Sequence, residues 1–479
     1  MISLRIVFHI LGWVIAWVGV MMFVPIAADM HHLDWEIFGR GSAITAFVGI
    51  SMILTTRQSG TPKLNYQQAY LVVVLGWILV ALFGAIPFLE MGISFSDSVF
   101  ETMSGITTTG STVLTGLDQM PPNILLWRAI LQWIGGIGII AIAVLILPFL
   151  RVGGMQLFKI ESSGSPEDKA ASVMKTLFLL GAAYIGLTAT CALLFDLFGM
   201  SAFDAITHAM TTLSTGGYSS YDASFGHFKD LRLHWIAILF MILAAVPFFL
   251  YVRMFLGDRR ALFRDAQVRG FVGFLVVASL GMTYWLMTQR DVELFRALTL
   301  TAFNITSVVT TTGFVSDDYT AWGPGAVGMF LVLSFIGGCS GSTSGAIKIY
   351  RFQILFIFVR SHIKRLFSPN RVLPLKYNGR LLPNDVPLSV LAFLVVFVAT
   401  IALFTVVLTL LGLDLVTAYS ASVTAITNVG PGLGTIVGPA GNFQVLPDAA
   451  KWALIFAMLA GRLEVLVLLV ALEPDFWRA

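Results

Sequence analysis

The chain is poor in charge and in cysteine. Only 11% of its 479 residues are charged, whereas an average soluble protein carries about 25%. Its two cysteines, Cys191 and Cys339, lie in apolar or glycine-rich stretches, so we expect no disulfide framework. No spacing of Cys and His suits a haem, iron–sulfur or zinc centre. A membrane redox subunit or another membrane enzyme would need such ligands, and we therefore expect no enzymatic activity.

Long apolar runs dominate what is present. The composition is 57% hydrophobic, with a mean hydropathy of +0.87, and many apolar runs are roughly 20 residues long, enough to span a bilayer as helices. The sequence therefore predicts an all-α, polytopic membrane protein. Charged residues, and no small-residue cleavage site, follow the first run at 2–28, so we expect this segment to be a retained helix.

A short pattern rich in threonine and glycine occurs four times. The copies are 107–111, 213–217, 310–314 and a degenerate one at 427–431. We align them on their central glycines, Gly110, Gly216, Gly313 and Gly430. One Thr-Thr-Gly in a membrane helix is typical of small-residue packing. Four copies, each between a short helix and a long apolar run, instead favour four loops around one pore, where exposed carbonyls replace the water shell of a cation.

The repeat divides the chain into five regions. Two N-terminal helices are expected within 1–60, followed by four pore units at 66–160, 170–260, 266–366 and 385–479. The N-terminal helices are expected at 4–28 and 39–56. The outer helices are expected at 68–90, 173–198, 268–288 and 387–411. The short re-entrant helices are expected at 97–107, 202–213, 293–309 and 415–426. The inner helices are expected at 124–150, 232–255, 325–360 and 449–472.

Basic residues set the expected orientation. They concentrate in the connections at 251–270 and 348–380, which by the positive-inside rule face the cytoplasm. Both termini are then cytoplasmic, and the four glycine loops open outward. The protein is expected to be multi-pass. The same basic segments are also candidates for contact with anionic membrane lipids.

Several motifs resemble one transporter superfamily over essentially the whole chain. They lie at 105–112, 132–138, 337–348 and 461–464. Together with the four units, they resemble the Trk/Ktr/HKT superfamily of cation transporters, and the two extra N-terminal helices point to its bacterial Trk-type potassium uptake subunit. The resemblance implies a location in a bacterial inner membrane and a homodimer with one pore per subunit. It also implies a separate cytoplasmic ring of nucleotide-binding regulatory subunits (TrkA-like). A nucleotide would then act only through that partner, and nucleic acid plays no part.

The candidate filter consists of the loop residues that can offer oxygen ligands. They are Thr108, Thr109, Gly110, Thr215, Gly216, Thr311, Thr312, Gly313, Asn428, Val429 and Gly430. Within this set, the expected K⁺ ligands are Thr109, Thr215, Thr312 and Val429. Neutral oxygens suit alkali cations, and glycine can turn its carbonyl inward without a Cβ clash. In the resembled family, glycine at all four central positions goes with a preference for potassium.

The candidate gate is a glycine-rich break in the third inner helix, where the resembled family has an intramembrane gating loop. Its residues are Gly337, Gly338, Gly341, Gly345, Lys348 and, from the last inner helix, Arg462. Glycine costs about 1 kcal/mol per position inside a helix, so the 337–345 run should interrupt it. A passive kink is one alternative. A phosphate-binding loop is excluded because no strand precedes the run and no Gly-Lys-Ser/Thr ending is present.

Two basic residues of the candidate gate, Arg462 and Lys348, lie in segments expected to be within the membrane. Arg462 has three possible roles: holding carbonyls of the 337–345 loop, placing a positive charge in the pore, or forming a structural ion pair. Glu464, two residues on, points to a different helix face and is not an obvious partner. Lys348 is either a second charge beside the pore or an interfacial side chain that snorkels.

The favoured function is gated, channel-like potassium uptake. The alternative is a secondary symporter that couples potassium to protons or sodium. Symport driven by protons would need a titratable relay within the membrane, for which Glu101, His208 and Glu464 are the candidates.

The fourth loop generates a prediction about selectivity. Asn428 and Val429 replace hydroxyl-bearing residues there, so one side of the pore offers fewer oxygen ligands. We expect one strong ion site and only modest discrimination of K⁺ against Na⁺, measured as reversal potentials in bi-ionic gradients. A steep potassium preference would contradict this expectation.

Overall fold

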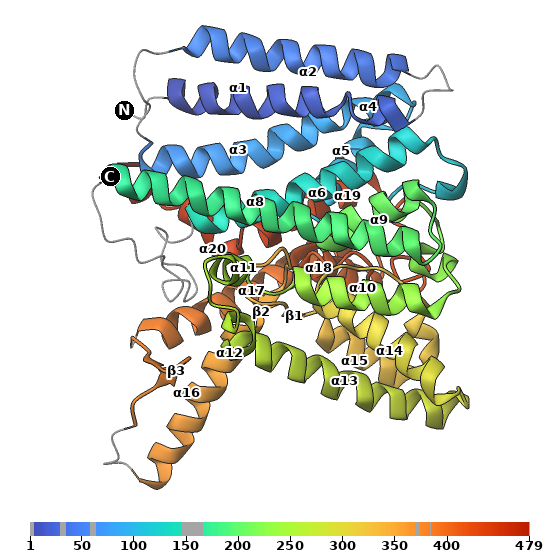
Figure 1. Ribbon diagram of the computed structural model, residues 1–479, viewed down its shortest axis with the longest axis vertical. Helices are drawn as coiled ribbons and strands as arrows, with labels where there is room; N and C mark the ends of the chain where they lie inside the picture. The colour runs from blue at the N-terminus through green and yellow to red at the C-terminus, as the bar shows by residue number, and fades with distance from the viewer. Residues whose placement is uncertain are drawn as a thin grey trace.

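The computed structural model describes residues 4–28, 35–57, 64–145, 166–368, 373–383 and 385–478 and is built almost entirely of helices (Figure 1). The N-terminal and first-unit elements are α1 (Leu4–Met21), η1 (Pro25–Ala28), α2 (Trp35–Thr56), α3 (Tyr66–Gly84), α4 (Ile86–Glu90), α5 (Phe95–Ile106), η2 (Leu117–Gln119) and α6 (Pro122–Leu145). The second-unit elements are α8 (Pro166–Leu197), α9 (Ala202–Leu213), η4 (Ser224–His227), α10 (Leu231–Ala244), α11 (Phe248–Phe255) and α12 (Ala261–Arg264).

The second half of the chain repeats this order with more interruptions. The third-unit elements are α13 (Ala266–Arg290), α14 (Leu294–Val309), η5 (Tyr319–Trp322), α15 (Pro324–Leu333), β1 (Ile336–Gly337), β2 (Ile347–Lys348) and α16 (Ile349–Phe367). A β3–β4 hairpin (Lys376–Tyr377 and Arg380–Leu381) follows. The fourth-unit elements are α17 (Asp385–Leu410), α18 (Leu415–Thr427), α19 (Asp448–Arg462), α20 (Val465–Val470) and α21 (Pro474–Arg478).

Helices α1, α2 and α3 form a layer at one side of the molecule (Figure 1). The α1–α2 contact depends on small residues, because a Cβ on Gly19 would lie 2.8 Å from the backbone nitrogen of Ala46. A Cβ on Gly49 would overlap the backbone of Ala16 in the same way. Backbones that approach this closely are typical of membrane helices, where van der Waals packing drives association. The expected helix 4–28 ends at Met21, before the turn at η1.

The four short helices α5, α9, α14 and α18 lie where the sequence predicts re-entrant segments. They contain 12, 12, 16 and 13 residues. A 12-residue helix is about 18 Å long and cannot cross about 30 Å of hydrocarbon. Three of them start with a side-chain cap: Ser94, Ser201 and Asp414 each accept a backbone N–H from the first turn. These caps satisfy donors that the helix itself leaves free.

The inner helices are less continuous than the sequence predicts. The expected 232–255 helix is two helices, α10 and α11, bent by 85° at the Ala245–Pro247 break. The expected 449–472 helix breaks at Leu463–Glu464, where Glu464 has a φ of 62°. The expected 325–360 helix is interrupted between α15 and α16, as the glycine run predicts. Of the expected 124–150 helix, 146–150 lie outside the described residues.

These breaks reduce the number of uninterrupted spans. Among the described residues, seven helices are long and apolar enough to cross a membrane, or eight if α10 and α11 count as one span. They are α1, α2, α3 with α4, α6, α8, α13 and α17. The third and fourth inner helices are each divided into two shorter helices, α15 with α16 and α19 with α20. The chain is thus a multi-pass helical membrane protein, as predicted.

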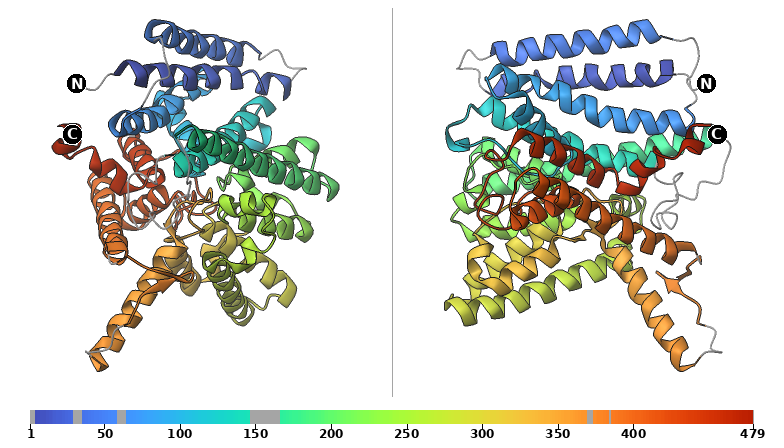
Figure 2. Two further views of the ribbon diagram at one scale, coloured as in Figure 1. Left: turned by 60° about the vertical axis from the view of Figure 1, so that its left-hand side comes forward. Right: turned by 180° about the vertical axis from the view of Figure 1, so that it is seen from behind.

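The helices of the four units surround a central zone of loops (left view of Figure 2). Helices α9 and α14 pack on α6 and α10, the inner helices of the units before them, and α5 packs on α19 of the last unit. Residues of α14, α15 and α18 line a small pocket between the third and fourth units. Both chain ends and the projecting helix α16 lie towards one side of the molecule, away from the loops that follow α5 and α9 (Figure 1).

Candidate functional site

The four loops after the short helices share one backbone conformation. In each, a non-glycine residue has a left-handed φ: 51° at Thr108, 52° at Thr215, 58° at Thr311 and 55° at Asn428. The next residue in each loop donates its N–H to the carbonyl five residues before it. These bonds are Thr109 to Ser104, Gly216 to Thr211, Thr312 to Ser307 and Val429 to Thr424, at 2.8–3.1 Å. A left-handed residue at a helix C-terminus turns the chain out of the helix axis.

This shared geometry corrects the alignment of the second loop. The residue after each of these N–H donors is a glycine with positive φ: Gly110, Gly217, Gly313 and Gly430, at 86°, 74°, 82° and 102°. Gly217, and not Gly216, is therefore equivalent to the other three filter glycines. Gly216 occupies the position of Thr109, and Thr215 that of Thr108. The sequence aligned Gly216 because Thr215-Gly216-Gly217 offers two glycines to choose from.

The four loops close into a ring. A Cβ added to any of the four glycines would come within 3.0 Å of a carbonyl oxygen in the next loop, a distance that Cβ atoms essentially never show. The pairs are Gly110 with Gly216, Gly217 with Thr312, Gly313 with Val429, and Gly430 with Thr109. The last pair returns to the first loop, so the contact passes once around four loops. Glycine is required at each position both for its φ and for this approach.

The ring faces a cavity of about 250 Å³. Its lining includes all four positive-φ glycines, Gly110, Gly217, Gly313 and Gly430. The charged side chains that line it, among the described residues, are those of Arg128 and Asp222. Asp222 accepts the backbone N–H groups of Gly116 and Leu117 at 3.0 and 3.1 Å, so its carboxylate also holds the loop that leads into α6.

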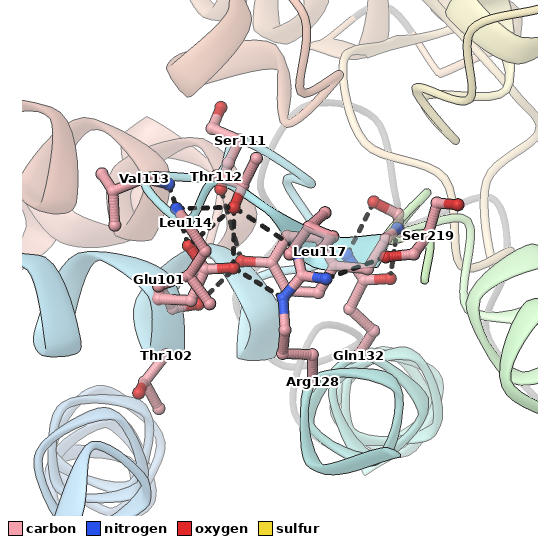
Figure 3. A network of polar contacts seen from close by, with 12 residues as sticks. Glu101, Thr102, Ser111, Thr112, Val113, Leu114, Leu117, Arg128, Gln132 and Ser219 are labelled. Carbon is pink, nitrogen blue, oxygen red and sulfur yellow. Dashed lines mark hydrogen bonds and ion pairs between the residues drawn. The ribbon is translucent and has the colours of Figure 1, made fainter. Parts of the chain in front are cut away.

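A buried ion pair supports the first two loops from behind (Figure 3). The Nε of Arg128 donates to Oε1 of Glu101 at 2.8 Å, and both side chains are buried. Glu101 also accepts the N–H of Val113 at 3.0 Å, while Arg128 donates to the carbonyl of Ser219 in the second loop at 2.9 Å. Removing one partner of such a pair strands a buried charge at about 3–5 kcal/mol.

Two of the relay candidates, Glu101 and His208, are held by structural contacts. Glu101 is engaged behind the filter, and Arg128 is a site residue that sequence reasoning missed, because its partner lies 27 residues away on another helix. His208 is buried, with its ring nitrogens 2.9 Å from the Asp204 carbonyl and 3.0 Å from Ser219 Oγ. Its role in the structure is therefore packing of the second short helix.

The glycine-rich segment between α15 and α16 folds back on itself. β1 and β2 pair in parallel, joining Ile336 to Ile347 and Gly337 to Lys348. Between them the loop covers the break in α10–α11. The N–H of Cys339 donates to the carbonyl of Ala245 at 2.9 Å, and the hydroxyl of Thr343 donates to that of Ala244 at 3.1 Å. The loop thereby satisfies carbonyls that the broken helix leaves free.

The same segment contacts two of the four filter loops directly. The N–H of Gly345 donates to Thr311 Oγ1 at 2.6 Å, and the N–H of Ala346 donates to the carbonyl of Thr427 at 2.9 Å. A Cβ on Gly345 would overlap that carbonyl. Of the predicted gate glycines, Gly337, Gly338 and Gly345 lie at tight backbone contacts, whereas Gly341 provides a turn with a φ of 77°.

Arg462 is buried at the end of α19 and reaches this segment. Its Nη1 donates to the carbonyl of Thr343 at 2.8 Å, and its Nη2 to that of Gly135 at 3.4 Å. Of the three roles open to it, the geometry matches the contact with the loop. The Nζ of Lys348 donates to the carbonyl of Ser344, so Lys348 also holds the loop, and its side chain is not exposed at an interface.

Glu464 pairs with a residue that the sequence did not indicate. Its Oε2 accepts Nη2 of Arg351 on α16 at 2.8 Å, and Arg351 is fully buried against the Phe393 ring. The expectation that Glu464 does not pair along its own helix holds. Its partner comes from another unit, which no local pattern reveals.

A ring of four re-entrant loops at the centre of a multi-pass helical bundle defines a membrane transport protein of the pore-loop class. A family model described as a cation transport protein, TrkH, matches residues 36–477. The chain therefore belongs to the TrkH family of cation transport proteins, which confirms the superfamily resemblance.

Three similar proteins extend along nearly the whole chain. The Trk system potassium uptake protein TrkI of Halomonas elongata is 45% identical, covering 97% of this chain and 95% of its own. TrkH of Escherichia coli K12 is 35% identical over 99% of both chains. The crystal structure of the potassium transporter TrkH from Vibrio parahaemolyticus is 32% identical, with a TM-score of 0.91 over 99% of this chain and 100% of that one.

The corrected register predicts the effect of alanine at position 217. Gly217→Ala should greatly reduce cation flux in reconstituted vesicles, because its Cβ would overlap the Thr312 carbonyl of the next loop. Gly92→Ala is the matched control: Gly92 has a similar φ of 82°, but open space lies around it, so only a backbone cost of about 1 kcal/mol is expected. Equal flux in the two variants would contradict the corrected register.

Proposed function

We propose that this protein mediates potassium uptake across a bacterial inner membrane as a gated, channel-like path. The observation that carries the proposal is the closed ring of four glycine loops, each in backbone contact with the next. The relatives named above are described as potassium uptake proteins, which supports K⁺ as the cation.

In this proposal a K⁺ ion enters from outside through the cavity above the ring. It exchanges water for backbone carbonyl oxygens at the equivalent positions Thr109, Gly216, Thr312 and Val429. Gly216 here replaces Thr215 of the expected ligand set, because Thr215 is equivalent to Thr108 and not to Thr109. The short helices end at these loops, so their C-terminal, partially negative ends favour a cation there. Inward flow needs only the membrane potential, which contributes about 2.3 kcal/mol per charge for each 100 mV.

A channel fits the titratable groups better than proton-coupled symport does. Each of the three candidates for a proton relay is already engaged. Glu101 pairs with Arg128, Glu464 pairs with Arg351, and both ring nitrogens of His208 lie within hydrogen-bond distance of partners. A relay group must exchange its proton, which these contacts oppose.

The segment 337–345 is the proposed gate. It lies against two filter loops and is held by Arg462 and by the carbonyls of the α10–α11 break. We infer that a cytoplasmic, nucleotide-binding ring of the TrkA type moves it, acting on the basic connections at 251–270 and 348–380, of which residues 369–372 lie outside the described residues. Cytoplasmic termini and a homodimer belong to the same proposal.

The proposal predicts K⁺-preferring flux into liposomes that contain this protein alone. Gly313→Asp should change that flux, because it places a carboxylate where the ring has a bare backbone carbonyl. The measurement is tracer uptake of K⁺ and Na⁺ driven by an imposed potential, with the Gly92→Ala variant as control.

Two results would count against the proposal. Flux without a K⁺ preference would remove potassium as the cation, and flux identical in the Gly313→Asp variant would remove the ring as the path. If neither protein conducts, adding the regulatory ring distinguishes a closed gate from an absent pore.

The gate generates its own prediction. Arg462→Ala removes a charge-assisted hydrogen bond to the loop carbonyl of Thr343, which is worth about 1.5–3 kcal/mol. Basal K⁺ flux should therefore rise by about tenfold or more. Arg232→Ala is the matched control, because Arg232 forms an exposed pair with Asp230 at the surface. Unchanged basal flux in the Arg462 variant would show that the hydrogen bond from Arg462 does not hold the gate closed.

A further inference from the structure

We propose that Gln132 on α6 is a positioning residue for the second filter loop and thereby tunes which cation the ring prefers. The proposal rests on the proposed function, since it concerns the ring of carbonyls as the path of the ion. It assigns to a side chain outside the four loops the support that the first and third loops provide for themselves.

Gln132 clamps the second loop on both sides of its filter glycine. Its side chain is fully buried and lies near Arg128 behind the loops (Figure 3). Its Nε2 donates to the carbonyl of Gly216 at 2.7 Å, and its Oε1 accepts the N–H of Tyr218 at 3.0 Å. Gly217 lies between these two anchored residues, so one amide fixes both ends of the turn.

The first and third loops are supported from within. In the first loop the hydroxyls of Thr107 and Thr109 lie 2.7 Å apart, and in the third those of Thr310 and Thr312 lie 2.8 Å apart. In each case the hydrogen bond ties the residue before the filter glycine to the end of its short helix.

The second loop lacks the atoms for that bond. Its equivalent residues are Ser214 and Gly216, and glycine has no hydroxyl. The hydroxyl of Ser214 instead donates to the carbonyl of Thr211 at 3.2 Å. The clamp from Gln132 replaces the missing internal bond.

Gln132 and Gly216 also fit one another sterically. A Cβ at position 216 would overlap the Cδ of Gln132 and come within 2.7 Å of its amide nitrogen. A threonine, as in the first and third loops, would therefore force the amide of Gln132 out of the position from which it holds the second loop. The glycine that replaces threonine at position 216 therefore forms a matched pair with Gln132.

The clamp makes the ring of carbonyls chemically unequal. The carbonyl oxygen of Gly216 shares its electron density with an amide donor, whereas no hydrogen bond reaches the carbonyl oxygens of Thr109, Thr312 and Val429 from the part of the chain that the structure describes. A donor on one ligand weakens its field at the ion. Because a weaker oxygen field recovers less of the hydration free energy of Na⁺, the smaller ion, than of K⁺, Gln132 favours K⁺.

The test compares variants by reversal potential and by thermal unfolding. Gln132→Met keeps the side-chain length but removes the donor and the acceptor. Its K⁺/Na⁺ permeability ratio should fall by about tenfold, the equivalent of about 1.4 kcal/mol, which is the upper size of one net hydrogen bond. Gln67→Met is the matched control. Gln67 donates to the Phe476 carbonyl at 2.8 Å near the chain ends, so its substitution should leave the ratio unchanged.

A swap separates the clamp from a general loss of folding. Gly216→Thr alone should disrupt the loop, and Gln132→Ala alone should lower the ratio. Combined, they remove the clash and let the introduced threonine hydroxyl reach that of Ser214, so the double variant should recover more of the flux and thermal stability of the wild type than the sum of the single effects predicts. Its K⁺/Na⁺ ratio should stay as low as that of Gln132→Ala, because no amide then donates to the carbonyl of residue 216.

The outcomes distinguish the two proposals. Wild-type flux without K⁺ preference overturns the proposed function, and the role of Gln132 with it. A K⁺-preferring wild type with an unchanged ratio in Gln132→Met overturns the clamp alone. A double variant with no more flux and no higher unfolding temperature than Gly216→Thr overturns the steric pairing of Gln132 with Gly216.

Discussion

Close approach of one backbone to another, possible only where a side chain is missing, is the constraint on which this structure depends. At four glycines, each loop abuts a carbonyl oxygen of the next. The same device holds the surrounding helices: a Cβ on Gly135 would overlap the carbonyl of Ile106, and one on Gly461 would overlap that of Ile426. The inner helices of the first and last units thus touch the ends of the short helices directly. Glycine is required here mainly because it has no side chain, and only secondarily because its backbone is flexible.

Much of the architecture could be predicted from the sequence because its signals are local. The short helices expected at 202–213 and 415–426 match α9 and α18 within one residue, since Ser201 and Asp414 mark their starts and the glycine loops mark their ends. The interruption near 337–345 followed from the cost of glycine inside a helix. In these places the local residues themselves determine where a helix starts, ends or breaks.

Several of the misses lie where the deciding partner is distant in sequence. Thr215-Gly216-Gly217 gives no local reason to prefer one glycine over the other; the left-handed φ at Thr215 and the contact with the third loop decide. The partners of Glu101 and Glu464 come from other helices. The bend before Phe248 had one local signal, Pro247. The carbonyls that the bend leaves free are satisfied by a loop nearly 100 residues later, and the local sequence does not reveal that partner.

The way that loop is held has a consequence for the proposed gate. Its N–H and hydroxyl groups donate to the carbonyls at the end of α10. Moving the loop would therefore break hydrogen bonds of the loop and of α10 at the same time. Polar backbone groups left bare in a dry interior are costly, and water is the one replacement that needs no further rearrangement. Opening and wetting of the path beneath the ring would then be a single event: the dry state is shut, and the first water molecules to enter stabilise the conducting state that admits more.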